Sequence, residues 1–550
     1  MPSFWSTNAT FLCGLLTTVY VHHKPVRGDV ALLAMAFWTC FVAECYKITS
    51  EASFLRAVQF SAYLSGIHLL TIGVLTMVYR ISPFHPLYRI PGPLLHRITS
   101  LNMVLMVSSG HRYSRMRALH QKYGKFVRTG PNTVSIYSSQ PISMIYSTAS
   151  AWNKSTAYNI SGPGYGLFFI QDREMHNDRR RHFWAPAFTT EALSGYEPML
   201  ERRTENLLKA LMIRQQNSRS KGCVDMSCAL QQWSHDVTNE FIFGDTYDVD
   251  LLMNGDDEHL VEGALLEAHI FEALGESPSL FHVLWHLPAT RIFRKMDKVV
   301  CRSIERRRRL GSQQADLMTH LLNDTPNGVN KLTEDDIRKE TIVAIQAGTN
   351  GISSALTFSF FYLAMNMNVQ HRLQEELKQA FRDHGTLNSR TLLDLPYLNA
   401  VVMETMRLGA PLGSFYRLVP KGGASIEGKY FPQDTIIGIP AWGQMVSEDN
   451  FYPEPFSFLP QRWLPNGLGE GSRLNKGAMM TFSHGPFGCI GKQLAHLEMR
   501  LVLSKVLLRH SLEFPPEFIP DTLLKSVHNR RATTFPYPLL VTLSEEHDAL

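Results

Sequence analysis

The 550-residue sequence lacks the features that define several large classes of protein. Its seven cysteines are an odd number without CxxC or Cys/His ligand spacing, which argues against a disulfide framework and against a structural zinc site. The net charge of +5 is mild and no nucleic-acid motif accompanies it, so nucleic acid is not an expected partner. No GxGxxG fingerprint lies between a strand and a helix pattern, so a nucleotide or flavin has no predicted site in this chain.

The first 81 residues contain three apolar stretches, at about residues 11–21, 30–46 and 60–79. The third has the roughly 20 residues that a membrane-spanning helix needs. We therefore interpret residues 1–81 as a membrane anchor with up to three transmembrane helices. Arginines at its exit favour a cytosolic location for the rest of the chain. With three spans the N-terminus is lumenal, so Asn8, in an Asn-Ala-Thr sequon, is a predicted glycosylation site.

Residues 82–97 contain four prolines and a glycine and are predicted to form a stiff connector. Helical periodicity dominates residues 98–550, which are predicted to form one cytosolic domain. The strongest helical segments are 191–215, 227–243, 292–322, 334–367 and 369–384, and β-rich runs occupy 133–137 and 424–440. The polar run 214–222 is predicted to be a surface loop. The expected class is mainly α with a minor β-sheet region.

The segment TFSHGPFGCIGKQLAHLE, residues 481–498, places Cys489 between a glycine-rich loop and a helical pattern. The dipole at a helix N-terminus favours a thiolate there. Gly485, Gly488 and Gly491 allow the backbone to approach something large and flat beside the sulfur. For a lone cysteine after glycines, the alternative is a buried structural thiol.

Four segments together resemble the cytochrome P450 family, in the correct order and at similar separations, across about residues 82–540. They are Phe482-x-x-Gly485-x-x-x-Cys489-x-Gly491, Glu404-Thr-Met-Arg407, Phe458-Leu-Pro-Gln-Arg462-Trp and His176-Asn-Asp-Arg-Arg180. The proline-rich connector and the multi-span anchor resemble the fungal membrane-bound members. The resemblance implies a cytochrome P450 fold preceded by N-terminal transmembrane helices.

The resemblance also implies roles for individual residues. Cys489 is expected to be the axial thiolate ligand of the iron in haem b. Three basic residues are expected to bind the two haem propionates: His176, Arg180 and Arg417. One acid and two arginines are expected to form a buried ionic network that maintains the haem pocket: Glu404, Arg407 and Arg462. The run of arginines at 179–181 leaves open which one points inward.

One departure from the family lies at Phe487, where a basic residue that contacts a propionate is usual, two positions before the cysteine. Haem retention is then expected to depend more on His176, Arg180 and Arg417, and haem affinity to be lower.

A second departure lies in the long helix 334–367, which resembles the central helix over the oxygen-binding face of the haem. Ala347 and Gly348 match its small-residue pair and are expected to leave space for a ligand. Asn350 and Gly351 stand where the family has an acid and an alcohol that pass protons during oxygen activation. Three accounts stay open: water beside Gly351 relays protons, a substrate hydroxyl does so, or the enzyme does not need that protonation.

The predicted function is that of a haem-thiolate monooxygenase that takes electrons from NADPH through a separate cytochrome P450 reductase. It is expected to insert one atom of O2 into a small lipophilic substrate, such as a fungal terpenoid or alkaloid, at the endoplasmic reticulum membrane. The pocket is expected to include parts of residues 158–169, 344–352 and 411–416. The basic block 306–309 is interpreted as a solvated helix surface or a docking site for an acidic redox partner or anionic lipid, and Lys492 as another docking charge.

Two other functions are considered. A haem-thiolate isomerase or dehydratase is suggested by Asn350 and Gly351, because such an enzyme does not require the usual relay. A non-catalytic protein that binds haem or ligand ranks last, because Cys489 and the three residues of the predicted ionic network are intact.

Overall fold

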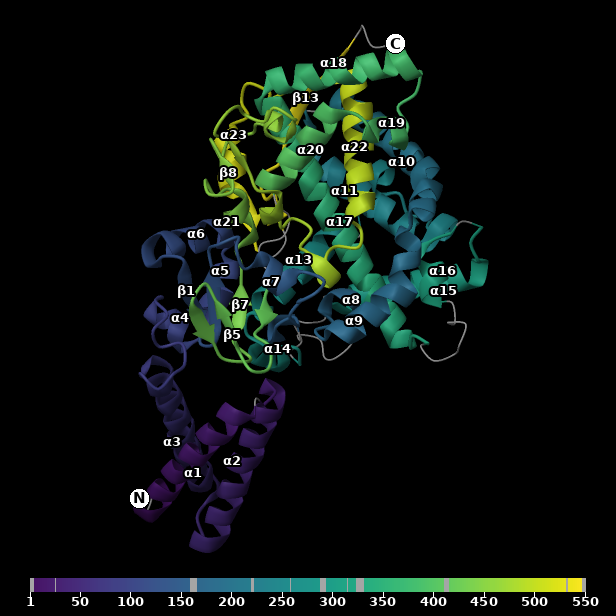
Figure 1. Cartoon of the computed structure of the whole chain (residues 1–550). Helices are drawn as coiled ribbons and strands as arrows, with labels where there is room; N and C mark the ends of the chain where they lie inside the picture. The colour runs from purple at the N-terminus through teal and green to yellow at the C-terminus, as the bar shows by residue number, and fades with distance from the viewer. Residues whose placement is uncertain are drawn as a thin grey trace.

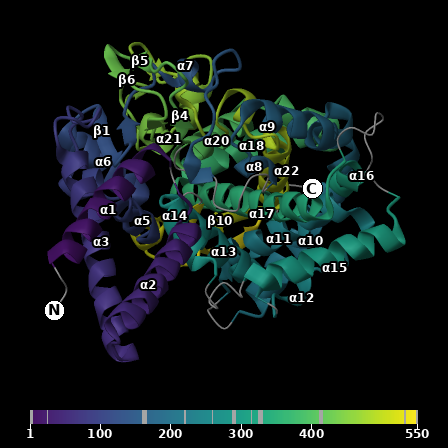
Figure 2. The ribbon, with the colours of Figure 1, turned by 90° about the horizontal axis from the view of Figure 1, so that it is seen from below.

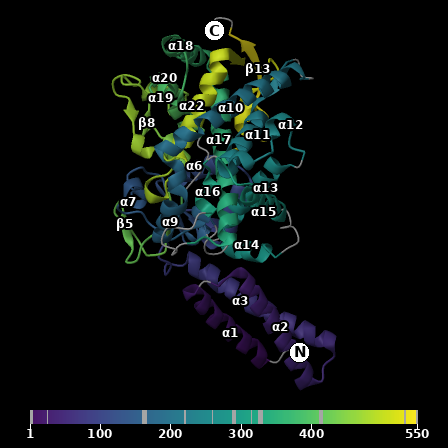
Figure 3. The ribbon, with the colours of Figure 1, turned by 90° about the vertical axis from the view of Figure 1, so that its right-hand side faces the viewer.

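The computed structural model describes residues 4–24, 26–158, 166–218, 222–257, 259–286, 293–313, 315–322, 331–409, 415–530 and 533–546. Three N-terminal helices project from a larger, mainly helical body (Figure 1). They are α1 (Phe4–His23), α2 (Gly28–Ser50) and α3 (Phe54–Ile81). Figure 3 shows them leaving the end of the body at which α14 (Pro278–Leu284) lies.

The three projecting helices expose apolar side chains. α1 and α2 both pack on α3, yet α2 has no buried side chain, and Leu33 and Phe37 are 70% and 75% exposed. Among the described residues, α2 and α3 are long and apolar enough to cross a membrane, whereas α1 is not in that set. Polar residues such as Thr7, Asn8 and Thr10 lower the mean hydropathy of α1. Two apolar N-terminal helices thus suggest a membrane anchor, against the three that the sequence allowed.

The anchor is fastened to the body at two places. The start of α2 lies directly against α14, because a Cβ on Gly28 would stand 1.9 Å from the backbone oxygen of Ser279. At the end of α3, the buried Arg128 donates a hydrogen bond to the carbonyl oxygen of Arg80 at 2.9 Å. The connector, residues 82–97, is irregular until α4 (Leu94–Ile98) begins. Its prolines explain the late start of that helix.

The long helices of the body follow the periodicity of the sequence. Those expected are α10 (Thr190–Gln216), α11 (Met226–Phe243), α17 (Glu334–Met365) and α18 (Met367–His384). The expected single helix over 292–322 is wrong, because α15 (Phe293–Leu310) and α16 (Leu317–Leu322) are separate. Gly311 takes a left-handed φ of +69° directly after α15, the conformation that commonly ends a helix. The expected loop over 214–222 begins later than predicted, because α10 continues to Gln216.

Of the remaining helices, α22 is as long as α11 and the others are shorter. These remaining helices are α5 (Leu101–Ser108), α6 (Arg112–Tyr123), α7 (Ile142–Tyr146), α8 (Gly166–Phe169), α9 (Arg173–Arg179), α12 (Leu251–Asn254), α13 (Leu260–Gly275), α19 (Ser389–Leu393), α20 (Pro396–Leu408), α21 (Ala441–Met445), α22 (Lys492–Arg509) and α23 (Pro520–Ser526).

Strands form a minor part of the fold. The largest sheet has the order β1-β2-β7-β4, with β2 and β7 parallel and the other pairs antiparallel. Its strands are β1 (Phe126–Gly130), β2 (Thr133–Ile136), β4 (Arg417–Leu418) and β7 (Ile436–Gly438). A second sheet joins β3 (Val224–Asp225), β10 (His510–Glu513) and β13 (Leu540–Glu545). Three two-stranded pairs comprise β5 (Ala424–Ile426) with β6 (Lys429–Phe431), β8 (Phe451–Tyr452) with β9 (Arg473–Leu474), and β11 (His528–Asn529) with β12 (Thr533–Thr534).

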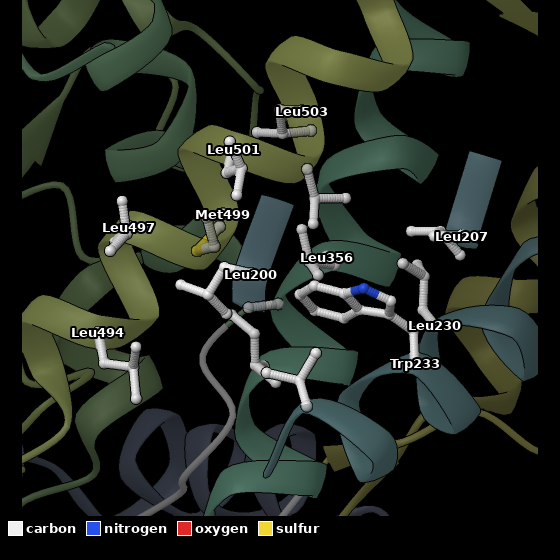
Figure 4. Close-up of a cluster of buried hydrophobic side chains, with 14 of the residues drawn as sticks. Leu200, Leu207, Leu230, Trp233, Leu356, Leu494, Leu497, Met499, Leu501 and Leu503 are labelled. Atoms are coloured by element: carbon white, nitrogen blue, oxygen red, sulfur yellow. The ribbon is translucent and has the colours of Figure 1, made fainter. Parts of the chain in front are cut away.

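The main hydrophobic core lies where α10, α11, α17 and α22 meet (Figure 4). Trp233 of α11 is fully buried among leucines from the other helices, including Leu200, Leu356 and Leu503. α17 runs through the middle of the body (Figure 2). A capping box starts it, in which the Thr333 hydroxyl accepts from the Asp336 N–H and the Asp336 carboxylate accepts from the Thr333 N–H. This core holds α17 and α22 in contact, and residues of both helices line the cavity described next.

Candidate haem-thiolate site

A cavity of about 350 Å³ lies between the middle of α17 and the loop before α22. Cys489 lines it from the loop. Four residues of α17, the segment predicted to lie over the oxygen-binding face of a haem, also line it: Ala347, Gly348, Asn350 and Gly351. Most of the remaining wall is apolar or aromatic, which suits a flat, largely apolar molecule with a few polar groups.

Cys489 is held by its own loop. Its N–H donates to the Phe482 oxygen at 2.8 Å, and α22 begins three residues later, at Lys492. Its side chain is exposed to the cavity and enclosed by protein. Burial raises the pKa of the Cys489 thiol, whereas a hydrogen bond from Gly491 and the charge of Arg180 oppose that rise. The Cys489 sulfur is therefore accessible to a group bound in the cavity.

The glycines of this loop serve different purposes. Gly488 and Gly491 line the cavity beside the sulfur, as expected. Gly485 does not line the cavity. It lies against the backbone of α7, since a Cβ on Gly485 would stand 2.0 Å from the backbone oxygen of Tyr146, and its φ is +65°. Gly485 is thus needed to pack the loop against α7 and not to admit a ligand.

Basic residues surround one end of the cavity. His176 of α9 and Arg180, which follows α9, line it, and Arg180 donates to the Gly488 oxygen at 2.6 Å. Arg179 instead pairs with Glu340 of α17 at 2.9 Å, and Arg181 is exposed. The structure therefore selects Arg180 as the inward-facing residue of the run. Burial and the neighbouring Lys154 and Arg180 lower the pKa of His176 to about 2, so His176 is a neutral hydrogen-bonding group in this environment.

Arg417 on β4 lies behind the ring of Phe487 and is 1% exposed. Its guanidinium carbon stands 4.9 Å from the centre of that ring, and its Nη1 donates to the Tyr416 oxygen at 3.0 Å. On the cavity side of the same ring lies Lys154, which the sequence analysis did not identify. A single lysine between Trp152 and Tyr158 carries no signal in the sequence that separates it from a surface lysine.

The side chains around the cavity fit a haem. Among the described residues, Lys154 and Arg180 line the cavity and Arg417 lies behind Phe487 without lining it, and none of the three forms an ion pair with a carboxylate, so an anionic ligand would complement them. Two buried nitrogens, Nδ1 of His176 and Nε of Arg417, also have no hydrogen-bond partner in that part of the chain. Two propionates would supply the missing acceptors, and Cys489 a thiolate for the iron. Haem bound there supplies the chemistry of dioxygen activation.

The two glycines of α17 differ in their surroundings. A Cβ on Gly348 would lie 2.6 Å from both Oγ1 and Cγ2 of Thr238 on α11, so the space that Gly348 leaves is largely taken by a neighbouring helix. This differs from the expectation that Gly348 makes room for a ligand. Around a Cβ on Gly351 nothing lies within 4 Å, so Gly351 is the glycine that opens space in the cavity. Thr238 itself lines the cavity and was missed, because its helix is far from α17 in sequence.

Neither serine after Gly351 replaces the missing alcohol in this structure. The hydroxyl of Ser353 donates to the Thr349 oxygen at 2.7 Å, and that of Ser354 donates to the Gly351 oxygen at 3.1 Å. Both protons are used by the backbone of their own helix. At the two positions of the usual relay, the cavity wall has the amide of Asn350 and the open space beside Gly351.

Glu404, Arg407 and Arg462 meet in the interior. Arg407 forms two hydrogen bonds with the Glu404 carboxylate, at 2.7 and 2.8 Å, and both residues are 0% exposed. Nε of Arg462 is 3.5 Å from Glu404, and the Trp463 indole N–H donates to the same carboxylate at 2.8 Å. None of the three residues lines the cavity. The group holds α20 to the segment around η6 (Pro460–Trp463).

The pocket wall expected from the sequence is found in part. Leu167, Phe168, Phe169 and Phe415 line the cavity, as do residues of α17 between Val343 and Ile352. Residues 159–165 and 411–414 of the expected wall lie outside the described residues. Phe188, Phe241 and Glu498 also line it and were not predicted.

The body is mainly α-helical, and Cys489 lies just before the N-terminus of α22. It faces a cavity lined by basic side chains that form no ion pair with a carboxylate of the described residues. These features are those of a haem-thiolate protein. Residues 91–535 match the family model described as Cytochrome P450. The chain belongs to the cytochrome P450 family, and it is a monooxygenase of that family.

Similar curated proteins come from fungi. The chain is 29% identical over 477 residues to the cytochrome P450 monooxygenase sthD of Phaeosphaeria nodorum, which covers 82% of this chain and 94% of that protein. It is 28% identical to averantin hydroxylase of Dothistroma septosporum, over 84% and 88% of the two chains. It is also 28% identical to tryprostatin B 6-hydroxylase of Aspergillus fumigatus, over 82% and 79%.

Proposed function

We propose that this protein binds haem b through Cys489 and inserts one atom of O2 into a small lipophilic molecule. The observation that carries the proposal is that Cys489 and Gly351, with its open space, line the same cavity. Aromatic side chains on its wall, among them Phe168, Phe241 and Phe415, favour an apolar substrate.

A reduced carbon monoxide difference spectrum of the membrane fraction tests the haem-thiolate site. Wild type is expected to give the Soret band typical of thiolate ligation, and Cys489→Ala to lose it. Cys301→Ala, a control at a partly buried cysteine of α15, is expected to keep it. A wild-type spectrum without that band would exclude the proposal.

Electrons are proposed to come from NADPH through a separate cytochrome P450 reductase. Three arginines of the block 306–309 already pair with acids of this chain: Arg306 with Asp248, Arg307 with Asp316 and Arg308 with Glu334. Lys492 is exposed beside the cysteine loop and is therefore the better docking charge. We expect Lys492→Glu to slow reduction by the reductase at low salt, and Lys421→Glu, at an exposed turn, to leave it unchanged.

The protein is proposed to be a multi-pass protein of the endoplasmic reticulum membrane with its haem domain in the cytosol. Asn8 is exposed on α1 and would be lumenal if all three helices span. Treatment with a deglycosylating enzyme is then expected to shift the mobility of wild type and not that of Asn8→Gln. No shift in wild type, with α2 and α3 still protected from protease, would favour two spans.

The substrate is proposed to be a fungal secondary metabolite, and its class, terpenoid or alkaloid, is the prediction that the resemblance gave. Averantin and tryprostatin B are substrates named for two relatives. At identities below 30%, these relatives support a role in such a pathway and not a choice of molecule. Comparing metabolites of a host that expresses wild type or Cys489→Ala tests the proposal, and identical profiles on every candidate extract would contradict it.

One observation favours a second function, the isomerisation or dehydration of an already oxygenated substrate. Asn350 and Gly351 offer no acid or alcohol, and the hydroxyl protons of Ser353 and Ser354 are donated to the helix backbone. Turnover without NADPH and reductase would support this alternative, and strict dependence on both would exclude it.

A further inference from the structure

The ring of Phe487 is enclosed by basic side chains. Nζ of Lys154 lies 4.8 Å from the ring centre and the guanidinium carbon of Arg417 lies 4.9 Å from it. The imidazole of His176 meets the ring edge to face, with centroids 4.6 Å apart. Phe487 therefore lies in the centre of a basic cluster, in which Lys154 and Arg417 are the cations and His176 is neutral, and it adds no charge of its own.

Lys154 is placed in this cluster by the backbone. Its main chain forms an antiparallel bridge with Arg417, and its N–H donates to the Gln171 oxygen at 3.1 Å. The side chain is 4% exposed and lines the cavity beside His176 and Arg180. The positive charges of Lys154 and Arg417 are thus fixed close to one another inside the protein. This arrangement is unfavourable unless an anion lies near them.

The charge of Glu340 acts on Lys154, but the Glu340 carboxylate is already bonded to Arg179, to the Leu167 N–H and to the Trp184 indole. No carboxylate of the described residues forms an ion pair with Lys154, and its ammonium donates to two carbonyl oxygens, those of Phe168 at 2.7 Å and Leu167 at 3.4 Å. An ammonium has three N–H donors, so one is left for a further acceptor. Burial and the charges of Arg417 and Arg180 lower the pKa of Lys154 well below its usual value, the direction expected for a cation that lacks its counterion.

We propose that Lys154 binds a haem propionate and thereby replaces the basic residue that is absent at Phe487. The inference rests on haem binding in this cavity. The phenyl ring fills the space of the absent basic chain and accepts cation–π contacts from Lys154 and Arg417. An aromatic ring carries no net charge and cannot neutralise either cation, whereas each of the two propionates supplies one negative charge. The expected low haem affinity of a chain with phenylalanine at 487 is then offset by Lys154.

The test measures the rate of haem transfer from the purified holoprotein to excess apomyoglobin. Lys154→Met is expected to lose haem about 10- to 100-fold faster than wild type, as for loss of a charge-assisted hydrogen bond. Lys154→Arg keeps the charge and is expected to stay near the wild-type rate. Lys209→Met, at an exposed lysine of α10, is the matched control.

The double variant Lys154→Met with Phe487→Arg separates a propionate contact from a structural role. Moving the charge to position 487 is expected to restore most of the retention, although the contacts with Phe168 and Leu167 stay lost. No restoration would assign Lys154 to holding those carbonyls and overturn the proposal. So would a Lys154→Met rate equal to that of Lys209→Met.

Haem dimethyl ester provides a second measurement, in case the double variant does not fold. Its neutral esters cannot pair with an ammonium, so wild type and Lys154→Met reconstituted with it are expected to lose it at equal rates. A difference as large as that with natural haem would overturn the proposal. The carbon monoxide band of wild type reports thiolate ligation independently, so failure of this inference is distinguishable from failure of the haem-thiolate site.

Discussion

Gly348 and Thr238 lie in direct contact across two helices, with the threonine side chain filling the position of the missing Cβ. α17 and α11 approach closely there, and the same threonine lines the cavity. Three residues further along α17, Gly351 has open space at the corresponding position. Two glycines in one motif therefore have opposite structural environments.

Alanine substitutions are expected to separate the two glycines. Gly348→Ala is expected to lower the free energy of unfolding by about 1–3 kcal/mol, because the new methyl group overlaps Thr238. Gly351→Ala is expected to raise it by up to about 1 kcal/mol, because alanine favours the helix and meets no atom. Denaturant unfolding of the purified proteins measures both. If the contact is the cause, Thr238→Ala should recover most of the loss in Gly348→Ala.

The buried ionic network is expected to be sensitive to the loss of one partner. Arg407→Met leaves the fully buried Glu404 without its two strongest hydrogen bonds and is expected to cost about 3–5 kcal/mol of unfolding free energy. Lys525→Ala removes an exposed ion pair, with Asp521 at 3.7 Å, and is expected to cost at most about 0.5 kcal/mol. Thermal unfolding of the two variants compares them. Equal, small losses would show that the network contributes little.

Proton delivery is expected to improve when the family pattern is restored on α17. Asn350→Asp with Gly351→Thr places an acid and an alcohol on the cavity wall, and Gly351 has the space for the larger side chain. We expect the ratio of product to released peroxide to rise. The measurement follows NADPH consumed, product and peroxide in a reconstituted system. Unchanged ratios would show that this part of α17 does not limit proton delivery.

Stability is expected to fall as the pH is lowered, because several histidines have lowered pKa values, and His85 in the connector is one of them. Burial, followed by the charges of Arg128 and Arg80, lowers the pKa of His85 to about 4. In the unfolded chain a histidine has a pKa near 6.5, so between about pH 6.5 and 4 the unfolded state binds the extra proton and is favoured. The apparent Tm should therefore decline over this interval. His85→Gln should reduce the slope, and the exposed His384→Gln should not.

Much of the site followed from local sequence. Glu404 and Arg407 are three residues apart on one helix and had to meet, and the glycine-rich loop before a helical pattern located Cys489 at the start of α22. The hydroxyl and carboxyl of a capping box started α17 where the sequence indicated. These features depend on residues within one or two turns of each other, so the sequence alone determines them.

Other features depend on contacts between distant segments. Which arginine of 179–181 points inward was decided by Glu340, more than 150 residues away, which takes Arg179 and leaves Arg180 to the cavity. The break after Leu310 came from a left-handed glycine that the helical periodicity concealed.

The sequence by itself indicated the family, predicted Cys489 as the ligand and revealed the two departures at Phe487 and Gly351. Only the tertiary structure decided what surrounds those departures. Lys154 reaches Phe487 through a bridge to Arg417 that joins segments more than 250 residues apart, and Thr238 reaches Gly348 through the packing of two helices. Side-chain patterns report local geometry, whereas neutralisation of a charge and occupation of a space are properties of the assembled interior.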